Sequence, residues 1–300
     1  MEGQVDEKII VQSLIGGSLL PFYLRCLKSL VTFCKDRIEL LLHSDGTLSK
    51  ADKDSIYSEF DGTFVSITNS SENTSNVLDC LQGRPNCQKV RKDSIWGIEF
   101  FDPIFSFPDD PISFYLDADI LFLRPFSGLF DRNQVKGGAI FLKDTQWDAY
   151  SFRPWQMLTD KKKLLAVKGI TTGLVFWDKT VIDWDYLEWF LGKNHLHHIP
   201  EWIMPTAQAG LANQCEAKTI SPRNLPNLYP NAQIYEDTFG VHLLGSYRRQ
   251  WMEKLESREN NQTENLPIIT PSFKKCVSQN IFGYSLRQMR RWKNTRLNVW

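Results

Sequence analysis

The stretch that decides the fold reads SFYLDADILFLRP, at residues 113–125. Its apolar residues are typical of a buried strand, and this strand runs into two acids, Asp117 and Asp119, with one small residue between them. Side chains two apart on a strand point to the same face, so the two carboxylates can converge on one ion. Ligands of open α/β sheets bind beyond the carboxyl ends of the strands, and carboxylate oxygens suit Mg²⁺ or Mn²⁺ holding a diphosphate. The stretch therefore predicts an α/β sheet with a metal site at its edge.

An Asp-x-Asp triplet also arises by chance, as a solvated turn after a strand. Here apolar runs flank the triplet on both sides and would bury its carboxylates beside the core unless they held a cation. Residues 93–123 also contain seven acidic residues and no Lys or Arg. These observations favour a metal site over a turn.

The chain on either side of this stretch alternates between strand and helix patterns. We expect strands at residues 8–14, 38–43, 63–68, 112–116, 138–142 and 173–177. We expect helices at residues 20–33, 49–60, 180–191 and 206–214, and a loop with a little helix at residues 69–85. Strands separated by helices indicate βαβ units, and therefore an α/β, Rossmann-like fold with a mostly parallel central sheet.

Composition divides the chain into one large domain and a tail. Residues 1–255 form the predicted domain, residues 256–273 a polar linker, and residues 274–300 a basic, aromatic segment with helical character. That segment contains seven Lys or Arg residues, and all 35 acidic residues of the chain precede it. Cations mixed with aromatic residues suit an anionic lipid surface, and they equally suit a solvated helical face docked on the domain.

The overall charge excludes other classes of protein. The chain carries 35 basic and 35 acidic residues, whereas a dedicated nucleic-acid binder has a basic excess. Hydrophobic residues make up 42% of the chain, which is too many for a disordered acidic protein.

No apolar run is long enough to cross a bilayer, and the apolar residues 9–24 follow acids rather than the basic region of a secretory signal. We expect a cytoplasmic protein, with the tail as a possible contact to the inner face of the membrane.

Two motifs together resemble a known family. The run YLDADILFLRPF, at residues 115–126, is similar to the D-x-D segment of nucleotide-sugar-dependent glycosyltransferases with the GT-A fold. VHLLGSYR, at residues 241–248, is similar to the H-x-x-G-x-x-K motif of their retaining family 8, which includes bacterial lipopolysaccharide galactosyltransferases and glycogenin. The two motifs occur in the expected order, with Arg248 replacing the lysine, so the resemblance implies a GT-A domain.

The resemblance implies a set of residues around a metal ion. Asp117, Asp119 and His242 would ligate it, and the imidazole would favour Mn²⁺ over Mg²⁺. Gly245 would let the backbone approach the diphosphate of a nucleotide-sugar donor, and Arg248 would neutralise that diphosphate.

Further donor contacts follow from weaker matches. Asp45 stands after the second strand, where GT-A enzymes contact the nucleoside; an ordinary Asp-Gly turn explains it equally well. Gly16 and Gly17 can bring backbone amides close to a ligand. Thr172 lies in ITTG, which is similar to the family's Asn-Ser-Gly, and Gln208 is the candidate polar group beside the donor sugar.

Residues that follow the strand at 138–142 could contact sugar or acceptor hydroxyls. Asp144 is the main candidate among them. The aromatic residues Trp147, Tyr150 and Trp155 either stack on a sugar ring or pack in the core.

The chain also departs from the family. Residues 14–19 read LIGGSL and lack the Asp and Tyr that grip the nucleobase, so the base stays open and a UDP-sugar is the default donor. Ala207 replaces an Asp of the family, which weakens the assignment of stereochemistry.

The expected function is transfer of a sugar, with retention, to a glycan, a lipid-linked or a small-molecule hydroxyl. One alternative is a non-catalytic GT-A protein that binds nucleotide sugars or carbohydrates. A lower-ranked alternative is a haloacid-dehalogenase-like phosphatase, whose D-x-D lies near the start of the chain and precedes a Thr-containing turn. Here Ile120 and Leu121 follow the triplet at mid-chain.

Overall fold

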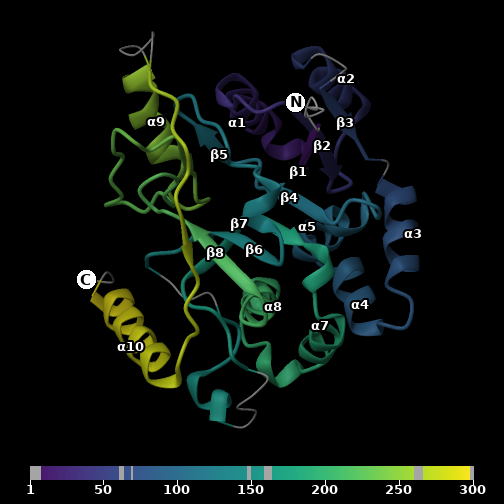
Figure 1. Ribbon diagram of the computed structural model, residues 1–300, viewed down its shortest axis with the longest axis vertical. Coiled ribbons are helices and arrows are strands. Elements are labelled where there is room, and N and C mark those ends of the chain that lie inside the picture. The colour runs from purple at the N-terminus through teal and green to yellow at the C-terminus, as the bar shows by residue number, and fades with distance from the viewer. Residues whose placement is uncertain are drawn as a thin grey trace, which may run out of the picture.

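A central eight-stranded sheet organises the molecule (Figure 1). The computed structural model describes residues 8–60, 64–68, 70–146, 150–158, 164–259 and 266–297, and for 256–259 and 290–297 the backbone alone. The strand order is β10-β8-β6-β7-β4-β1-β2-β3. The strands of this sheet are β1 (Ile9–Ile15), β2 (Ile38–Ser44), β3 (Val65–Ile67), β4 (Ile112–Leu116), β6 (Gly138–Lys143), β7 (Ile170–Asp178), β8 (Glu216–Ile220) and β10 (Phe273–Lys275). A separate two-stranded sheet pairs β5 (Ile120–Phe122) with β9 (Gly240–His242).

The pairing pattern confirms the predicted α/β fold with a mostly parallel sheet. β1 runs parallel to both β2 and β4, β2 is parallel to β3, and β6 is parallel to β8. β7 is antiparallel to β4 and β6, and β10 is antiparallel to β8. Because β1, β2 and β4 are parallel neighbours, their carboxyl ends meet at one edge of the sheet.

Helices cover both faces of the sheet (Figure 1). On one face lie α1 (Leu20–Phe33), α2 (Lys50–Glu59) and the short α6 (Arg132–Val135). On the other lie α3 (Ser70–Cys80), α4 (Pro85–Asp93), α5 (Ile95–Phe105), α7 (Trp184–Leu191) and α8 (Ile203–Ala212). Two helices remain, α9 (Arg248–Glu259) beside the small sheet and α10 (Ile281–Leu297) at the periphery.

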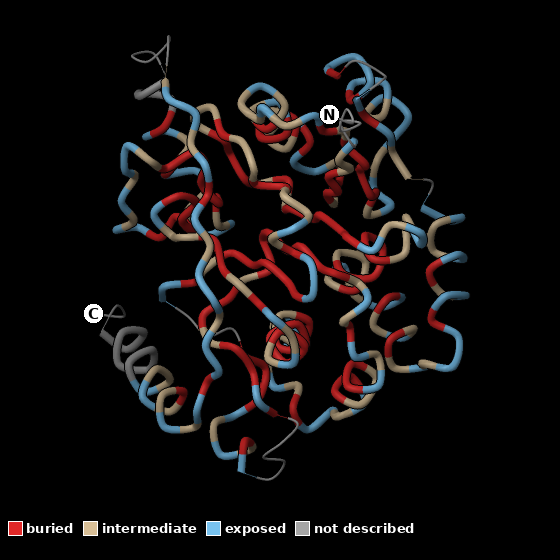
Figure 2. The backbone as a smooth tube through the Cα atoms, viewed as in Figure 1, coloured by how far each residue is buried: buried red, intermediate tan, exposed pale blue. Residues whose placement is uncertain are grey.

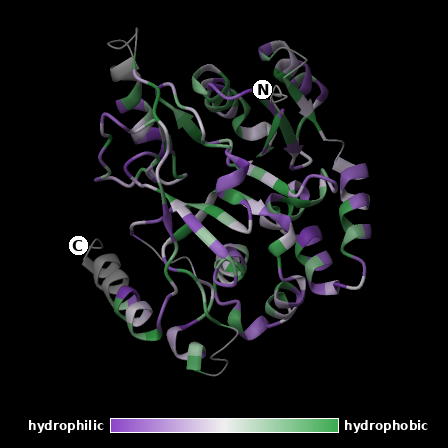
Figure 3. Ribbon diagram, in the orientation of Figure 1, coloured by the Kyte–Doolittle hydropathy of each residue, from purple (hydrophilic) through white to green (hydrophobic). Residues whose placement is uncertain are grey.

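The central strands are buried on two faces, which explains their nearly continuous apolar sequence. Successive residues of β7 point to opposite faces, so Trp177 packs with α5 and α8 while Phe176 packs with Phe114 of β4 and with Phe130. Phe176 meets Phe114 edge to face, with 5.0 Å between the ring centroids. Figures 2 and 3 show buried, hydrophobic residues along these strands and mostly hydrophilic ones on the outer helix α3.

The predicted loop at residues 69–85 is wrong. Helix α3 occupies most of it, and Val77 and Leu81 are buried against α5. The polar residues that predicted a loop instead join a buried network. The amide of Asn73 donates to Asp102, and the guanidinium of Arg91 donates to the same carboxylate. Because these partners lie in other helices, the local sequence gives no sign of them.

The basic C-terminal segment is attached to the domain through β10, through backbone hydrogen bonds of residues 276–279 and through α10. β10 extends the central sheet beside β8. Tyr284 of α10 is buried, and its hydroxyl donates to the carbonyl of Phe152 over 2.6 Å. None of the helices in the described part of the chain combines the length and the apolar character that a bilayer crossing needs.

A substitution at Phe176 tests whether this residue lies in the hydrophobic core. Replacing it by Ala should lower the free energy of unfolding by about 3–5 kcal/mol, because a buried Phe leaves a cavity when truncated. Urea denaturation measures this change. The matched control is Phe282→Ala, since Phe282 is 71% exposed; it should shift stability by about 0.5 kcal/mol or less. Equal losses in both variants would contradict the assigned core.

Candidate functional site

The two acids and the distant histidine meet where two short strands pair. Asp117 and Asp119 lie in the turn between β4 and β5, and His242 is the last residue of β9. Ile120 of β5 stands opposite His242, and the amide of Leu243 donates to the carbonyl of Asp119 over 3.1 Å. One ligand atom from each of the three side chains lies within 4.8 Å of the others. The structure thus brings together the three residues predicted to hold a metal.

Asn227 orients the imidazole of His242. The amide oxygen of Asn227 lies 2.7 Å from Nδ1 of His242 and can only accept, so Nδ1 carries a proton. The other nitrogen, Nε2, faces Asp119 Oδ1 at 3.1 Å and Asp117 Oδ2 at 3.7 Å. Histidines that ligate metals usually donate their second nitrogen to such a partner. The imidazole is therefore held in the orientation that a metal ligand needs.

Neighbouring groups set the charge of the two carboxylates. The hydroxyl of Tyr115 donates to Asp117 over 2.9 Å, and the guanidinium of Arg248 donates to Asp119 over 2.7 Å. Burial, and then the charge on Asp119, raises the pKa of Asp117 to about 6. Burial acts on Asp119 in the same direction, but His242 and Arg248 outweigh it and lower the pKa of Asp119. A divalent cation beside both would favour their ionised forms.

The donor set fits a divalent ion. Oδ1 of Asp119 is buried without a hydrogen-bond donor and points toward His242. A cation held by Asp117, Asp119 and His242 would satisfy this oxygen. Two carboxylates combined with an imidazole suit Mn²⁺, and Mg²⁺ accepts the carboxylates alone.

A glycine makes room for the imidazole. A Cβ atom at Gly173 would lie 2.5 Å from Cε1 and 2.8 Å from Nδ1 of His242, which no side chain tolerates. The carbonyl of Gly173 also accepts from the amide of Asp117 over 2.8 Å, so this residue contacts both motifs. The preceding Thr172, predicted to bind the donor, is buried and hydrogen-bonds the carboxyl group of Glu99.

An open cleft of about 220 Å³ lies beside the metal ligands. It forms where the carboxyl ends of β1, β2 and β4 meet. Four of its lining residues were predicted to be functional: Gly16, Asp45, Asp117 and Asp119. Four others contribute aromatic or acidic groups that were not predicted to be functional: Tyr23, Trp96, Glu99 and Tyr115.

Asp45 forms the predicted turn and also borders the cleft. Its Oδ1 accepts from the amide of Thr47 over 2.9 Å, and Gly46 has a φ of +92°. A Cβ at Gly16 would lie 2.1 Å from Oδ2 of Asp45, so a larger residue there would displace the Asp45 carboxylate. Gly17 instead donates its amide to the hydroxyl of Thr47 over 2.8 Å and does not line the cleft.

Gln208 lies behind the cleft. Its side chain is 2% exposed, and Nε1 of Trp177 lies 3.4 Å from its amide oxygen. It lines a second cavity of only about 10 Å³, which shares Glu99 and Tyr115 with the cleft.

Asp144 is also buried. It accepts from the hydroxyl of Tyr229 over 2.9 Å, and its charge helps to raise the pKa of His242. Among the nearby aromatic residues, Tyr150 stacks on Phe152 in the core and Trp155 is 63% exposed, while Trp147 lies outside the described residues.

Of the two residues expected from the second motif, Arg248 contacts a metal ligand and Gly245 has open space around its Cβ position. The guanidinium of Arg248 lies over the ring of Phe22, 4.7 Å from its centroid, besides bonding Asp119. Gly245 is exposed, and a Cβ built there meets nothing within 4 Å.

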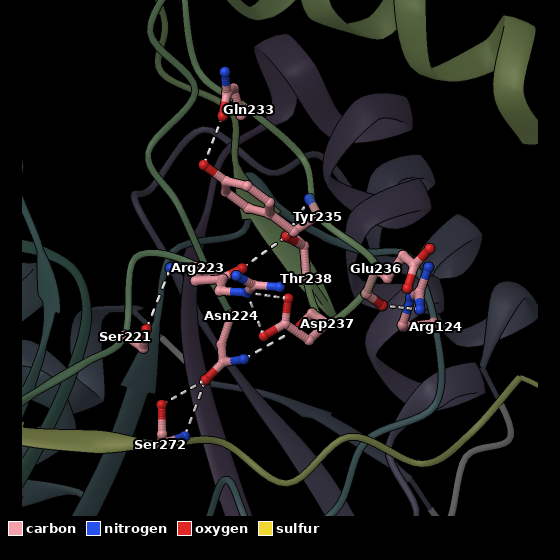
Figure 4. Close-up of polar contacts among 10 residues, drawn as sticks. All are labelled: Arg124, Ser221, Arg223, Asn224, Gln233, Tyr235, Glu236, Asp237, Thr238 and Ser272. Atoms are coloured by element: carbon pink, nitrogen blue, oxygen red, sulfur yellow. Dashed lines mark hydrogen bonds and ion pairs between the residues drawn. The ribbon is translucent and has the colours of Figure 1, made fainter.

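A polar network fixes the loop that leads into β9 (Figure 4). The amide of Asn224 donates to the carbonyl of Asp237 over 3.0 Å, and its oxygen accepts from the backbone and hydroxyl of Ser272. Arg223 pairs with Asp237 and lies over the ring of Tyr235. These contacts join the loop to the segment before β10, and so they hold the strand that carries His242.

Sequence reasoning missed Asn227, Glu99 and Tyr115. Tyr115 carried a usable signal, because it stands two residues before Asp117 on the same strand face. Glu99 stood among seven acids without a nearby cation in the sequence. Asn227 carried none, since its contact to His242 depends on the loop path.

Comparisons with known proteins identify the fold. No protein-family model matches the chain, and no curated protein matches it in sequence. Its structure is similar to mouse xyloside xylosyltransferase 1 in the apo form, at 11% identity over 79% of this chain and 97% of that one, with a TM-score of 0.54. It is also similar to the galactosyltransferase LgtC solved with donor and acceptor sugar analogues. The identity is 10% over 86% of this chain and 97% of that one, and the TM-score is 0.55. The chain therefore has the GT-A glycosyltransferase fold.

A substitution at Gly173 tests the arrangement of the three proposed metal ligands, Asp117, Asp119 and His242. Gly173→Ala should weaken Mn²⁺ binding by about tenfold or more, because the new methyl group displaces the imidazole and ligand-positioning changes have effects of this size. Isothermal titration with Mn²⁺ alone measures it. Gly245→Ala is the matched control and should bind Mn²⁺ like the wild type, since open space surrounds that glycine. Unchanged affinity in Gly173→Ala would contradict a role for His242 as a ligand.

Proposed function

We propose that the chain is a metal-dependent glycosyltransferase that moves a sugar from a nucleoside-diphosphate sugar to a hydroxyl acceptor. The observation that carries the proposal is the convergence of Asp117, Asp119 and His242 beside a cleft that the two acids line. The cleft lies at the carboxyl edge of the strands, where ligands of α/β sheets bind. The GT-A fold supports the reaction class, and the resemblance to the retaining family 8 supports retention.

The residues of the cleft would divide the work of transfer. When bound, the divalent ion would supply positive charge for the leaving diphosphate. Arg248 would add a second positive charge, because its guanidinium already lies at Asp119. The cleft wall would hold the donor so that an acceptor hydroxyl approaches the anomeric carbon. With retention, the leaving phosphate accepts the proton of that hydroxyl, and no protein nucleophile is required.

Two predicted catalytic residues would act from behind this wall. Gln208 would support Glu99 and Tyr115 across the small cavity that they share. Asp144 would act through its charge on His242, which increases the basicity of the imidazole.

A UDP-sugar is the proposed donor. Asp45 borders the cleft at the end of β2, where it can accept from ribose hydroxyls or the base. Tyr23 and Trp96 supply aromatic faces beside it, which would replace the aromatic residue missing from the first loop. Gly16 would let the donor approach the backbone of β1 closely.

Incubation with a panel of nucleotide sugars and Mn²⁺ tests the proposal. We expect release of the nucleoside diphosphate from at least one donor, and Asp119→Asn should reduce that release by about a hundredfold or more, because it removes a metal ligand. Asp93→Asn, at an exposed acid that ends α4, is the matched control and should keep full activity.

A non-catalytic binding protein would give a different pattern. It would bind a nucleotide sugar in the presence of Mn²⁺, by titration, and release no nucleoside diphosphate from any donor. That outcome would overturn the transferase and favour the alternative.

A lipid-linked acceptor is supported by the exposed face of α10. Phe282, Leu286 and Met289 are exposed at spacings of four and three, so they form one stripe along the helix. Lys274 and Lys275 of β10 are exposed as well. An apolar stripe combined with cations suits an anionic membrane surface, and we infer peripheral attachment at the cytoplasmic face of the membrane.

Co-sedimentation with vesicles of phosphatidylglycerol and phosphatidylcholine tests this attachment. The double variant Phe282→Ser, Leu286→Ser should bind about tenfold more weakly, because two apolar side chains are lost from the contact. Tyr57→Ser, at a 45% exposed residue of α2, should bind like the wild type. Equal binding by both variants would contradict a role for α10 in membrane attachment.

A further inference from the structure

Glu99 stands between the cleft and the small cavity behind it. It lies on α5, which packs against β1 and β4, and its side chain is half-buried. Glu99 and Tyr115 line both cavities, so these two side chains separate the open cleft from Gln208.

The carboxyl group of Glu99 has little to neutralise it. The hydroxyl of Thr172 donates to it, and no Lys or Arg among the described residues pairs with it. Burial and then the charge on Asp117 raise the pKa of Glu99 well above its ordinary value. A half-buried carboxylate is stable only with partners that donate hydrogen bonds or carry positive charge. Because Glu99 lines the open cleft, a ligand bound there can supply such partners.

Glu99 is not part of the metal triad. Among the described residues, Asp117, Asp119 and His242 form the only group of three or more acidic, histidine or cysteine side chains whose ligand atoms lie within 4.8 Å of one another. A divalent cation held there would offset the negative charge of Asp117 and Asp119 and so favour the ionised form of Glu99. The ionised carboxylate accepts hydrogen bonds and donates none.

Gln208 cannot meet a sugar directly in this arrangement. The cavity it lines measures about 10 Å³, enough for about one water molecule. Its amide oxygen is also turned toward Nε1 of Trp177. A sugar ring in the cleft would therefore meet Glu99 and Tyr115 first.

We propose that Glu99 accepts hydrogen bonds from hydroxyl groups of the transferred sugar and so determines which sugars the site takes. This inference rests on the proposed function and deepens it. The sugar is a neutral hexose with free hydroxyls. A uronic acid would place a further carboxylate beside Glu99 and Asp117, and like charges at short range repel.

Titrations with UDP, UDP-glucose and UDP-glucuronate in the presence of Mn²⁺ test the inference. The wild type should bind UDP-glucose more tightly than UDP-glucuronate. Glu99→Gln and Glu99→Ala should each weaken UDP-glucose binding by about tenfold or more, the loss expected for hydrogen bonds to a charged group. Both variants should bind UDP itself like the wild type, because UDP has no sugar; this readout also reports that they are folded. The preference against UDP-glucuronate should shrink in both.

The matched control is Glu72→Gln, at an exposed acid of α3, which should leave all three affinities unchanged. Equal loss of UDP and UDP-glucose binding in the Glu99 variants would show a merely structural role and overturn the inference. So would unchanged UDP-glucose binding. Failure of the wild type to bind UDP in the presence of Mn²⁺ would overturn the proposed UDP-sugar donor first, and the inference with it, so the two failures are distinguishable.

Discussion

The pairing of β5 with β9 is the interaction on which the site depends. It sets Ile120 opposite His242 and thereby carries an imidazole to two carboxylates that lie much earlier in the chain. The pairing produces a usable site only because other contacts agree with it: Gly173 leaves space for the ring, and Asn227 aims its Nε2 at the carboxylates. A metal site needs this agreement, since a ligand that is misplaced or misoriented loses affinity.

Negative charge is the second constraint. Asp45, Glu99, Asp117 and Asp119 all border one cleft, and Arg248 pairs with just one of them, Asp119. Burial, and then the charge of neighbouring acids, raises the pKa values of Asp117 and Glu99. A divalent ion would offset the charge of Asp117 and Asp119, and the hydroxyl groups of a sugar would donate hydrogen bonds to Glu99. Perturbed carboxyl groups in a cleft are typical of functional sites.

Local sequence predicted most of the architecture. The helix at residues 20–33 and the strand at residues 112–116 were predicted with their observed bounds, because their apolar patterns are local and strong. The loop predicted at residues 69–85 was wrong, because its polar residues find partners in other helices, as Asn73 does with Asp102. In the site, the metal ligands stand in motifs and were predicted. Asn227 and Glu99 stand in no motif, and only packing brings them to the others.

The sequence by itself determined the fold class, the carboxylate pair at the end of a buried strand and the histidine that would join it. The fold class and the carboxylate pair follow from side-chain period, burial and spacing along the chain, whereas the histidine follows from the resemblance to the family's H-x-x-G-x-x-K motif. Tertiary structure alone decided that Gln208 lies behind the cleft, that Arg248 bonds Asp119, and that Glu99 faces the space beside the metal ligands. The reason is physical: which buried polar groups meet depends on how helices and loops pack across the sheet, and a single sequence does not record those distances.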